Sequence, residues 1–375
     1  MAVVAIITSH APSLVNFRLE FISLLASKGH KVFAIAPSIG PKVRAQLESV
    51  SASVIEIPLS RAGINPLHDL LTLLAIIRTL SRIKPDTCLS YFAKPVVYGS
   101  IAARVAGVPN VFAMIEGLGV VFTDSQAGIS FSIKIKRAIV GLLYRLALSR
   151  VTRVIFLNND DCRDFINRDI ASPRQAFLLG GIGVDLECFK PSQHCHQTPV
   201  FIMAARLIKE KGVEDFVRAS RYVKTEFPNC LFYLLGGLDE KKRGSFGHQD
   251  LDKWKAEGNV EICGHVDVKP FLQRGGVFVL PSYYREGVPR STQEAMAAGL
   301  PIITTDVPGC RETVVDGVNG FLVPAHNAKA LAKAMKRFIV QPALIKSMGK
   351  ESRRMAEERF DIHKVNLRLA ESMGL

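Results

Sequence analysis

The sequence predicts an α/β protein made of two Rossmann-like, doubly wound domains that face a central cleft. Short β-branched runs alternate with longer segments of helical period, which is the pattern of parallel sheets covered by helices. The alternation runs through the first half of the chain and restarts at Val200. A length of 375 residues also exceeds what a single hydrophobic core usually fills.

Two sets of strands follow from this pattern, with helices in the gaps between them. In the first half we expect strands at residues 3–7, 32–36, 54–57, 87–90, 111–113 and 154–157. In the second half we expect strands at residues 200–204, 231–235, 260–262, 277–280 and 301–304. Because ligands collect at the carboxyl ends of parallel strands, the cleft between two such domains is the expected site.

The connection between the domains is expected where glycine, proline and polar residues concentrate, in residues 180–199. We place the boundary near residue 190, which gives domains of residues 1–190 and 191–360. Residues 361–375 are expected to form a C-terminal helix that packs back on the first domain.

Composition describes an ordered globular protein, with 48% hydrophobic and 22% charged residues. The apolar residues 1–8 have no preceding Lys or Arg and predict a first buried strand in a cytoplasmic protein. The stretch 67–83 is interrupted by His, Asp and Arg, which argues against a membrane span and predicts a buried amphipathic helix. Seven cysteines, an odd number, favour reduced thiols.

The net charge of +14 is unevenly distributed. Between Asp124 and Asp160 there is no acidic residue, and six cations lie among apolar residues: Lys134, Lys136, Arg137, Arg145, Arg150 and Arg153. Such a stretch suits an anionic surface. A nucleic-acid-binding protein would also be basic, but residues 133–153 contain one aromatic residue, Tyr144, for stacking on bases, so this alternative is disfavoured.

The most informative stretch for chemistry is residues 281–299, which follow a predicted strand. A loop with Glu286 and Gly287 leads into a helix that we expect to begin at Pro289. The free amides and the positive dipole end of this helix form a phosphate site. Glu286 and Glu294 are spaced to accept hydrogen bonds from hydroxyls at both ends of a nucleotide sugar; the alternative is an ordinary amphipathic helix with two solvated glutamates.

Several segments together resemble one enzyme family. Glu286 and Glu294 match the E-x7-E signature of family 4 glycosyltransferases, and EGVPRSTQEAMAAGLPIITTDVPGCRETVVDGVNGFLVP (286–324) resembles that family along its whole length. AARLIKEKGVEDF (204–216) resembles its Arg-x4-Lys element. HAPSLVNFR and IEGLGVVFTD resemble a branch that elongates polyprenyl-diphosphate-linked sugars for bacterial surface glycans or glycoproteins.

The resemblance implies the GT-B fold, with the acceptor bound by the first domain and the nucleotide sugar by the second. Arg206 and Lys211, after the strand at 200–204, would stabilise negative charge on the departing diphosphate in place of a metal. In isolation these residues also fit a solvated basic turn. Glu286 would hold the transferred sugar and Glu294 the ribose.

Further donor contacts are implied beside these residues. The resemblance implies that the backbone around Val266 reads the base. Main-chain donors and acceptors suit uracil, and another base stays open. Many relatives have glycine where this chain has Pro289, which lacks an N–H to donate. We therefore expect donor contacts to move to neighbouring groups, those of Gly287, Val288, Arg290 and Ser291.

In the first domain, the loop 9–15 joins the first strand to a helix expected near Asn16. The loop lacks a G-x-G-x-x-G fingerprint, which argues against a hydride-transfer fold. In similar enzymes it approaches the donor phosphate, so His10 and Asn16 are candidates for substrate contact, with a structural role for His10 as the alternative. Glu116 falls where many family members have histidine, and a carboxylate there could orient or partly deprotonate the acceptor hydroxyl, with an ordinary loop glutamate as the alternative.

No metal and no other cofactor is expected. Asp250 and Asp252 form an Asp-x-Asp pair, but they follow a polar stretch and are expected to open a surface helix. A second candidate group lies in the linker and matches no common zinc spacing: Cys188, His194, Cys195 and His196.

The resemblance thus implies retaining transfer of a sugar from a UDP-sugar donor to a polyprenyl-diphosphate-linked acceptor. No motif names the sugar, which we expect to be an N-acetylhexosamine. An apolar, anionic acceptor would account for the basic stretch, with contacts from Lys134, Lys136 and Arg137 and peripheral association with the inner face of the cytoplasmic membrane. A core-packed helix with solvated cations is the alternative. Among enzymes, a GT-B sugar-nucleotide epimerase and a transferase with a soluble acceptor stay open.

Overall fold

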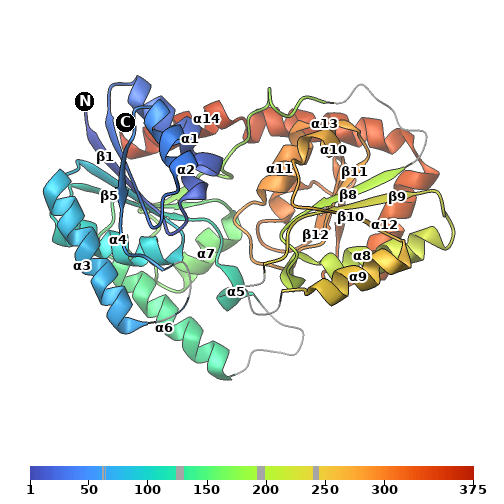
Figure 1. Cartoon of the computed structure of the whole chain (residues 1–375), viewed down its shortest axis with the longest axis horizontal. Helices are drawn as coiled ribbons and strands as arrows, with labels where there is room; N and C mark the ends of the chain where they lie inside the picture. The colour runs from blue at the N-terminus through green and yellow to red at the C-terminus, as the bar shows by residue number, and fades with distance from the viewer. Residues whose placement is uncertain (61–62, 64, 124–130, 192–198, 240–244) are drawn as a thin grey trace. The chain divides into compact units, whose positions relative to one another are not determined.

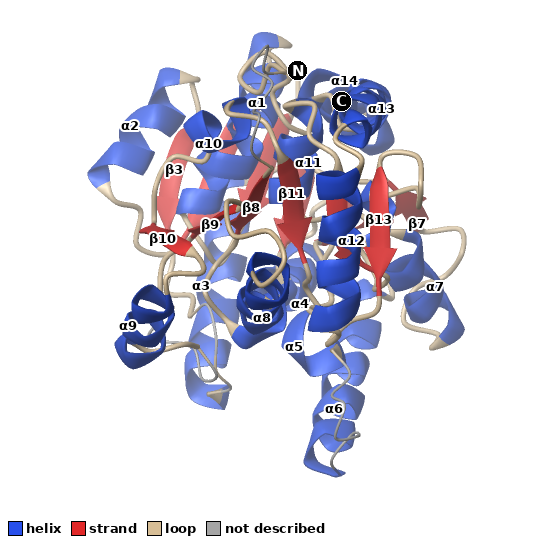
Figure 2. Cartoon of the chain, turned by 90° about the vertical axis from the view of Figure 1, so that its right-hand side faces the viewer, coloured by secondary structure: helices blue, strands red, loops and turns tan. Residues whose placement is uncertain are grey.

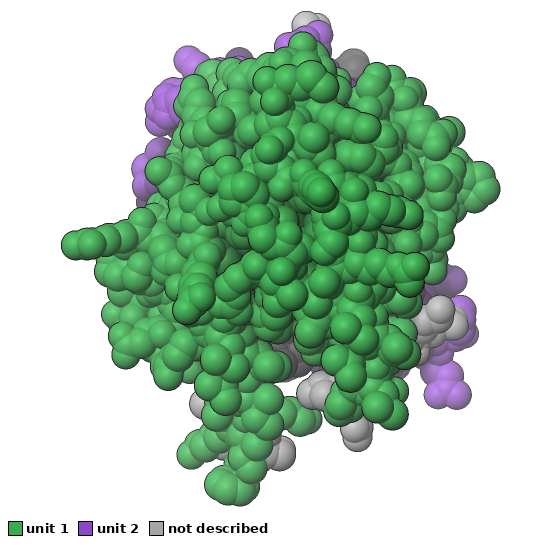
Figure 3. All heavy atoms as spheres, turned by 90° about the vertical axis from the view of Figure 1, so that its left-hand side faces the viewer, with its two compact units in different colours: residues 1–182, 363–375 green, residues 183–362 purple. Residues whose placement is uncertain are grey.

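The computed structural model describes residues 1–60, 63, 65–123, 131–191, 199–239 and 245–375. The chain divides into two units, which Figure 3 distinguishes by colour. Unit 1 consists of Met1–Ile182 together with His363–Leu375, and unit 2 consists of Gly183–Ile362. The division falls a few residues before the boundary expected near residue 190, and the C-terminal end returns to unit 1.

Unit 1 is built on a parallel sheet with the strand order β3-β2-β1-β4-β5-β6-β7 (Figure 1). Its strands are β1 Val3–Ile7, β2 Lys31–Ala36, β3 Ser53–Glu56, β4 Thr87–Tyr91, β5 Asn110–Ile115, β6 Arg153–Phe156 and β7 Ala176–Leu178. Its helices are α1 Pro12–Ser27, α2 Pro41–Ser49, α3 Pro66–Ile83, α4 Ala93–Val105, α5 Gly119–Phe122, α6 Phe131–Leu148, α7 Asn159–Asn167 and α14 Ile362–Met373. Helices cover both faces of the sheet, so its central strands are apolar runs.

Unit 2 repeats the architecture with the strand order β10-β9-β8-β11-β12-β13 (Figure 2). Its strands are β8 Val200–Ala204, β9 Leu231–Leu235, β10 Glu261–Gly264, β11 Val277–Leu280, β12 Ile302–Thr305 and β13 Gly320–Val323. Its helices are α8 Val213–Lys224, α9 His248–Glu257, α10 Lys269–Gln273, α11 Arg290–Ala297, α12 Ala328–Val340 and α13 Ala343–Arg359, with short 3₁₀ turns η1 Lys209–Lys211 and η2 Arg311–Thr313.

The predicted strands are confirmed in both units. Those at 3–7, 200–204, 231–235 and 277–280 match to the residue, and the ends of the others shift by one or two residues. Strands β7 and β13 are additional to the predicted strands. Both are short edge strands, which pair with a neighbour on one side only and therefore carry a weaker apolar pattern.

The stretch 67–83 does form a helix, α3, but the prediction that this helix is buried is wrong for one face. Ile76 and Leu80 enter the core, whereas four leucines on the opposite face keep between 52% and 76% of their surface exposed: Leu67, Leu70, Leu71 and Leu74. Because α3 is apolar on both faces, the apolar pattern of the sequence does not show which face is buried and which is exposed. None of the helices described is both long and apolar enough to cross a membrane.

Helix α13 approaches the end of α11 closely at Gly349. A Cβ added there would lie 2.2 Å from the carbonyl oxygen of Gly299, just after α11. A Cβ added at Gly141 in α6 would meet only the Ile170 side chain, at 3.8 Å. The first helical glycine is therefore required by packing, and the second is not.

We predict opposite effects for alanine at these two positions. Gly349→Ala is expected to lower the free energy of unfolding by about 1–3 kcal/mol, because the methyl group forces α13 away from α11. Gly141→Ala, the matched control, is expected to raise it by about 0.5–1 kcal/mol, because alanine favours the helix without a clash. Denaturant unfolding measures both, and a stabilising Gly349→Ala would contradict the close approach.

Candidate functional site

The site of unit 2 lies where β8 and β11 end side by side. These strands are parallel neighbours in the sheet, with Val277 opposite Phe201. The chain leaves β8 toward η1 and leaves β11 toward the loop of residues 281–289. The order of the strands reverses between them, which is the position where open α/β sheets bind ligands.

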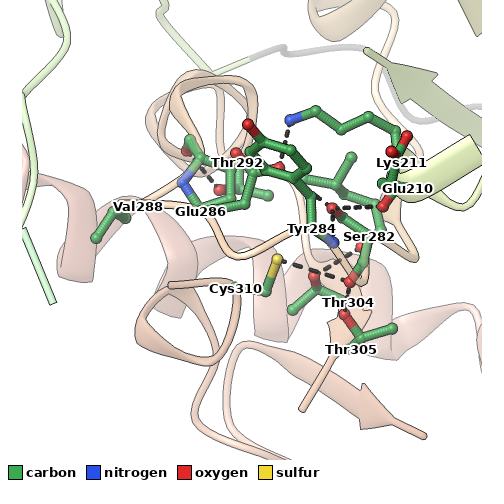
Figure 4. Close-up of polar contacts among 12 residues, drawn as sticks. Glu210, Lys211, Ser282, Tyr284, Glu286, Val288, Thr292, Thr304, Thr305 and Cys310 are labelled. Carbon is green, nitrogen blue, oxygen red and sulfur yellow. Dashed lines mark hydrogen bonds and ion pairs between the residues drawn. The ribbon is translucent and has the colours of Figure 1, made fainter. Parts of the chain in front are cut away.

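Lys211 and Glu286 meet at this position (Figure 4). The Lys211 ammonium donates to the Glu286 carboxylate, and only 14% and 12% of the two side chains are exposed. The Ser282 hydroxyl lies 3.2 Å from the same carboxylate oxygen, and the Tyr284 ring centroid lies 5.8 Å from the ammonium. The structure thus brings together two residues that the sequence analysis assigned separately.

Backbone contacts fix η1 against the loop after β11. The N–H groups of Tyr283 and Tyr284 donate to the Glu210 carbonyl oxygen at 2.9 and 3.0 Å. Gly212 has a φ of 74°, and a Cβ there would lie 2.0 Å from the Pro281 carbonyl oxygen. The chain can therefore make this approach only with glycine at position 212.

Cys310 lies beneath the loop, where Figure 4 shows its sulfur directed toward the Ser282 backbone. Burial raises the pKa of the Cys310 thiol to about 12. The thiol therefore stays protonated at neutral pH and cannot act as a nucleophile.

Helix α11 begins one residue later than expected, with Pro289 as its N-cap and Arg290 as its first residue. The buried Gln293 donates to the Val288 carbonyl oxygen at 3.1 Å and accepts from the Gly183 N–H at 3.1 Å. This glutamine, which the sequence analysis missed, holds the segment that leads into the helix. The helix dipole and terminal amides at this end favour an anion.

Glu294 and Arg290 form the second ion pair of the site. Arg290 Nε, one helical turn earlier, donates to the Glu294 carboxylate at 2.8 Å. Burial raises the pKa of Glu294, and the Arg290 guanidinium opposes that rise. Ser291, half-buried beside Arg290 in the first turn, and the buried Gly287 complete this end of the loop and helix.

Arg206 and Val266 lie toward solvent. Arg206 pairs with Asp239 at 3.1 Å, and 45% of its side chain is exposed. Val266 follows β10 and is exposed as well. Lys211 is therefore the more buried of the two basic residues predicted to meet a diphosphate, and Arg206 is the one more screened by water.

Unit 1 has a polar network at its own reversal point, between β1 and β4. The Ser13 hydroxyl lies 2.9 Å from the Tyr91 hydroxyl and 3.2 Å from that of Thr8. The Ser13 N–H donates to the His10 carbonyl oxygen at 2.9 Å, so the loop turns directly into α1. This helix begins at Pro12, and the expectation of a start near Asn16 is wrong because proline occupies the first turn; Asn16 is exposed within the helix.

Glu116 is ion-paired with Arg18 of α1, a residue that the sequence analysis did not select. Arg18 is fully buried, and 8% of the Glu116 side chain is exposed. The guanidinium also lies 5.2 Å from the Tyr91 ring centroid. Burial raises the pKa of Glu116, and the Arg18 charge opposes the rise. Arg18 lies within HAPSLVNFR, so the signal was present in the segment that carried the resemblance.

The three predicted acceptor cations lie on α6 of unit 1. Lys134 and Lys136 are exposed. Arg137 is half-buried, donates to the Thr123 carbonyl oxygen at 3.1 Å, and has its guanidinium 5.9 Å from the Phe122 ring centroid.

The described residues contain no group of three or more His, Cys, Asp or Glu that could hold a metal ion. Asp250 accepts from the Gly247 N–H at 2.9 Å and caps α9, which confirms the expected surface helix. Cys188 lies 3.0 Å from an Asp185 carboxylate oxygen. The other members of the linker group lie outside the described residues: His194, Cys195 and His196.

Comparison with known sequences finds glycosyltransferase families along both halves. The model of glycosyl transferases group 1 matches residues 186–355, and that of glycosyl transferase 4-like proteins matches residues 5–158. A Campylobacter jejuni N,N'-diacetylbacillosaminyl-diphospho-undecaprenol α-1,3-N-acetylgalactosaminyltransferase is 27% identical, over 92% of this chain and 91% of that protein. An Escherichia coli UDP-Gal:α-D-GlcNAc-diphosphoundecaprenol α-1,3-galactosyltransferase is 26% identical, over 92% and 89%.

Solved structures agree on the fold. A sucrose-phosphate synthase from Thermosynechococcus elongatus superposes with a TM-score of 0.81 at 20% identity, over 99% of this chain and 98% of that chain. Anabaena HepE in complex with UDP and glucose superposes with a TM-score of 0.77 at 17% identity, over 100% of both chains. Both likenesses concern the fold alone.

The buried pair in unit 1 gives a prediction for stability. Arg18→Met is expected to lower the free energy of unfolding by about 3–5 kcal/mol at neutral pH, because Glu116 then lacks its cation. Burial holds the folded pKa of Glu116 above its unfolded value, so the cost is full above the folded pKa and vanishes below the unfolded pKa. The loss should therefore shrink as the pH falls, as measured by denaturant unfolding across pH. Arg18→Met combined with Glu116→Gln should recover part of the stability, and a loss independent of pH would contradict the pairing.

Proposed function

The chain belongs to the group 1 glycosyl transferases and has the GT-B fold, and we propose that it is a retaining α-glycosyltransferase that moves a sugar from UDP to a polyprenyl-diphosphate-linked saccharide. The product would serve a bacterial surface glycan or glycoprotein. Two relatives named for diphosphoundecaprenol-linked acceptors support the acceptor class. The observation that carries the proposal is the buried Lys211–Glu286 pair beside the start of α11.

The donor binds along the loop and helix that follow β11. Its diphosphate lies against the start of α11, where the amides of Arg290 and Ser291 and the helix dipole neutralise charge. Glu294 accepts hydrogen bonds from the ribose, and Glu286 accepts them from the transferred sugar, which we take to be an N-acetylhexosamine. The main chain at Val266, with that of Gly287 and Val288, completes the contacts to base and phosphate.

The reaction takes place on one face of the sugar. The acceptor oxygen bonds to the anomeric carbon on the side from which the diphosphate leaves, so the configuration is retained. The bond from that carbon to the phosphate oxygen breaks, and the acceptor proton passes to a donor phosphate oxygen. Lys211, with Arg206 farther out, stabilises the negative charge that builds on UDP, and no metal ion takes part.

Lys211 can do this because its position is fixed before the donor arrives. The Glu286 carboxylate and the Tyr284 ring already hold the ammonium between two strand ends. A charge that does not have to move when the bond breaks costs no reorganisation during the reaction. Burial also strengthens its field, since little water screens it.

Unit 1 binds the acceptor. Glu116 orients the attacking hydroxyl, with His10 and Asn16 at the adjoining loop and helix. The cations Lys134, Lys136 and Arg137 attract the anionic lipid, so the enzyme works in the cytoplasm, at the inner face of the cytoplasmic membrane.

A panel of UDP-sugars with a polyprenyl-diphosphate-linked saccharide tests the function. We expect transfer from a UDP-N-acetylhexosamine, an α-linkage in the product by NMR, and unchanged turnover in excess EDTA. Loss of turnover with EDTA, restored by Mg²⁺ or Mn²⁺, would contradict the role of Lys211. Interconversion of UDP-sugars without acceptor would indicate an epimerase, and transfer to soluble sugars alone would exclude the lipid acceptor.

Two substitutions separate binding from chemistry. Glu294→Gln is expected to raise the Kd for UDP by about 10–100-fold, because a charged hydrogen-bond acceptor is lost. Lys211→Met is expected to lower kcat by about 10²–10³-fold with a smaller change in Kd. Lys209→Met, an exposed lysine in the same turn, is the matched control and should leave both unchanged.

The pH dependence of UDP binding provides a second test of Glu294. Because burial raises its pKa, protonation should weaken UDP binding at a higher pH than for an ordinary glutamate. Calorimetric titration of the wild type across mildly acidic pH should show this weakening, and Glu294→Gln should not. Identical pH profiles would show that Glu294 does not meet the nucleotide.

A further inference from the structure

Helix α3 presents an exposed apolar face, formed by Leu67, Leu70, Leu71 and Leu74. The spacing of three and four residues places these leucines on one side of the helix. Arg78 and Arg82 are exposed in its later turns. Asp69, the acidic residue of α3, is buried and pairs with Lys94 at 2.7 Å. The exposed side of α3 therefore combines leucine with positive charge.

Helix α6 presents a second face of the same kind. Between 45% and 78% of the surface is exposed for its outward apolar residues, which are Phe131, Ile135, Ile139, Leu142 and Leu146. Its inner side, with Tyr144 and Leu148, joins the core of unit 1. The helix contains no acidic residue in its sequence.

Both faces begin at the same end of unit 1 and run along their helices. Helices α3 and α6 each pack against α4, and their inner sides join one core. Helices of a doubly wound sheet run antiparallel to its strands, so their N-terminal ends lie at the carboxyl edge of the sheet. Figure 1 and Figure 2 show both helices reaching the same end of unit 1, and in Figure 3 two projections extend from that end. This edge also carries His10 and Glu116.

A cationic pocket of about 400 Å³ lies along α6 beside its apolar face. Its lining includes Phe122, Lys134, Arg137, Arg145 and Arg168, and none of the described lining residues is acidic. Arg145 donates to the carbonyl oxygens of Asp169 and Arg168 at 3.0 and 2.6 Å, which fixes the guanidinium without neutralising its charge. Arg168 is paired with Asp164 at 2.6 Å.

We propose that the α3 and α6 faces form one docking surface for an anionic phospholipid bilayer. The leucines of α3 enter the acyl region beside the apolar residues of α6, and the cations of the pocket and of α3 bind lipid phosphates. Burial of apolar side chains and attraction to anionic lipid act together in this kind of association. This inference rests on the proposed function, since it locates the bilayer that holds the acceptor at the carboxyl edge of unit 1.

Charge distinguishes the bilayer from another copy of the chain. A twofold dimer through this surface would bring the same cations of two protomers together, which is unfavourable without acidic partners. An anionic bilayer supplies the complementary charge. It also accepts apolar side chains without a matching shape on the partner.

Vesicle sedimentation tests the surface with the full chain. Wild-type protein should bind vesicles of equal parts phosphatidylcholine and phosphatidylglycerol, should bind phosphatidylcholine alone weakly, and should be released as salt rises. Leu70→Gln combined with Leu74→Gln should weaken binding by at least about tenfold. The matched control, Leu231→Gln with Val340→Gln, alters two exposed apolar residues of unit 2 and should bind as the wild type does. Arg78→Gln combined with Arg82→Gln should weaken binding to the vesicles that contain phosphatidylglycerol and leave binding to pure phosphatidylcholine vesicles unchanged.

Activity assays separate this inference from the proposed function. The α3 leucine variant should keep wild-type kcat/KM on a water-soluble, short-chain diphosphate acceptor and lose at least about tenfold on acceptor embedded in vesicles. Equal vesicle binding by that variant and the wild type would overturn the docking surface. So would a wild-type protein that is dimeric when the leucine variant is monomeric, because the leucines would then bind a second copy of the chain. Absence of sugar transfer by a wild type that binds vesicles as expected would instead refute the proposed function and leave the docking surface standing.

Discussion

Lys211 and Glu286 come from segments that follow neighbouring strands, and each is a largely buried charge that the other neutralises. The two segments that carry them are held together by backbone contacts. Two backbone N–H groups bond the Glu210 carbonyl oxygen, and glycine at position 212 allows the two segments to approach within contact. The position of the lysine charge therefore follows from the packing of β8 against β11, and the proposed chemistry depends on that position.

Unit 1 also contains a buried ion pair near the reversal of its strand order. Arg18 and Glu116 also lie near the reversal of strand order, but here the cation comes from a helix and is fully buried. A carboxylate held in this way has a defined orientation and a raised pKa, which suits it to accept a hydrogen bond from a hydroxyl. The ion pair with Arg18 already occupies one oxygen of this carboxylate. Its proposed role is accordingly to orient the acceptor.

The exposed apolar faces of α3 and α6 bear on how unit 1 reaches its proposed acceptor. A lipid-linked acceptor stays in its bilayer, so an enzyme that uses it must hold its site near the lipid surface. The N-terminal ends of α3 and α6 extend from the carboxyl edge of the sheet, where the Arg18–Glu116 pair also lies. The parallel topology that creates the binding edge thus also directs exposed apolar residues toward the same side.

The sequence by itself determined the two α/β units, most strand positions and the motif residues, because apolar periodicity and strand-to-loop spacing are local properties of the chain. Through a resemblance it also made Lys211, Glu286 and Glu294 candidates for the site. The tertiary structure decided which charges meet: Lys211 with Glu286, Glu116 with the unselected Arg18, and Arg206 with Asp239. It also decided that four leucines of α3 face outward. Pairing and burial depend on segments far apart in the chain, which no local pattern records.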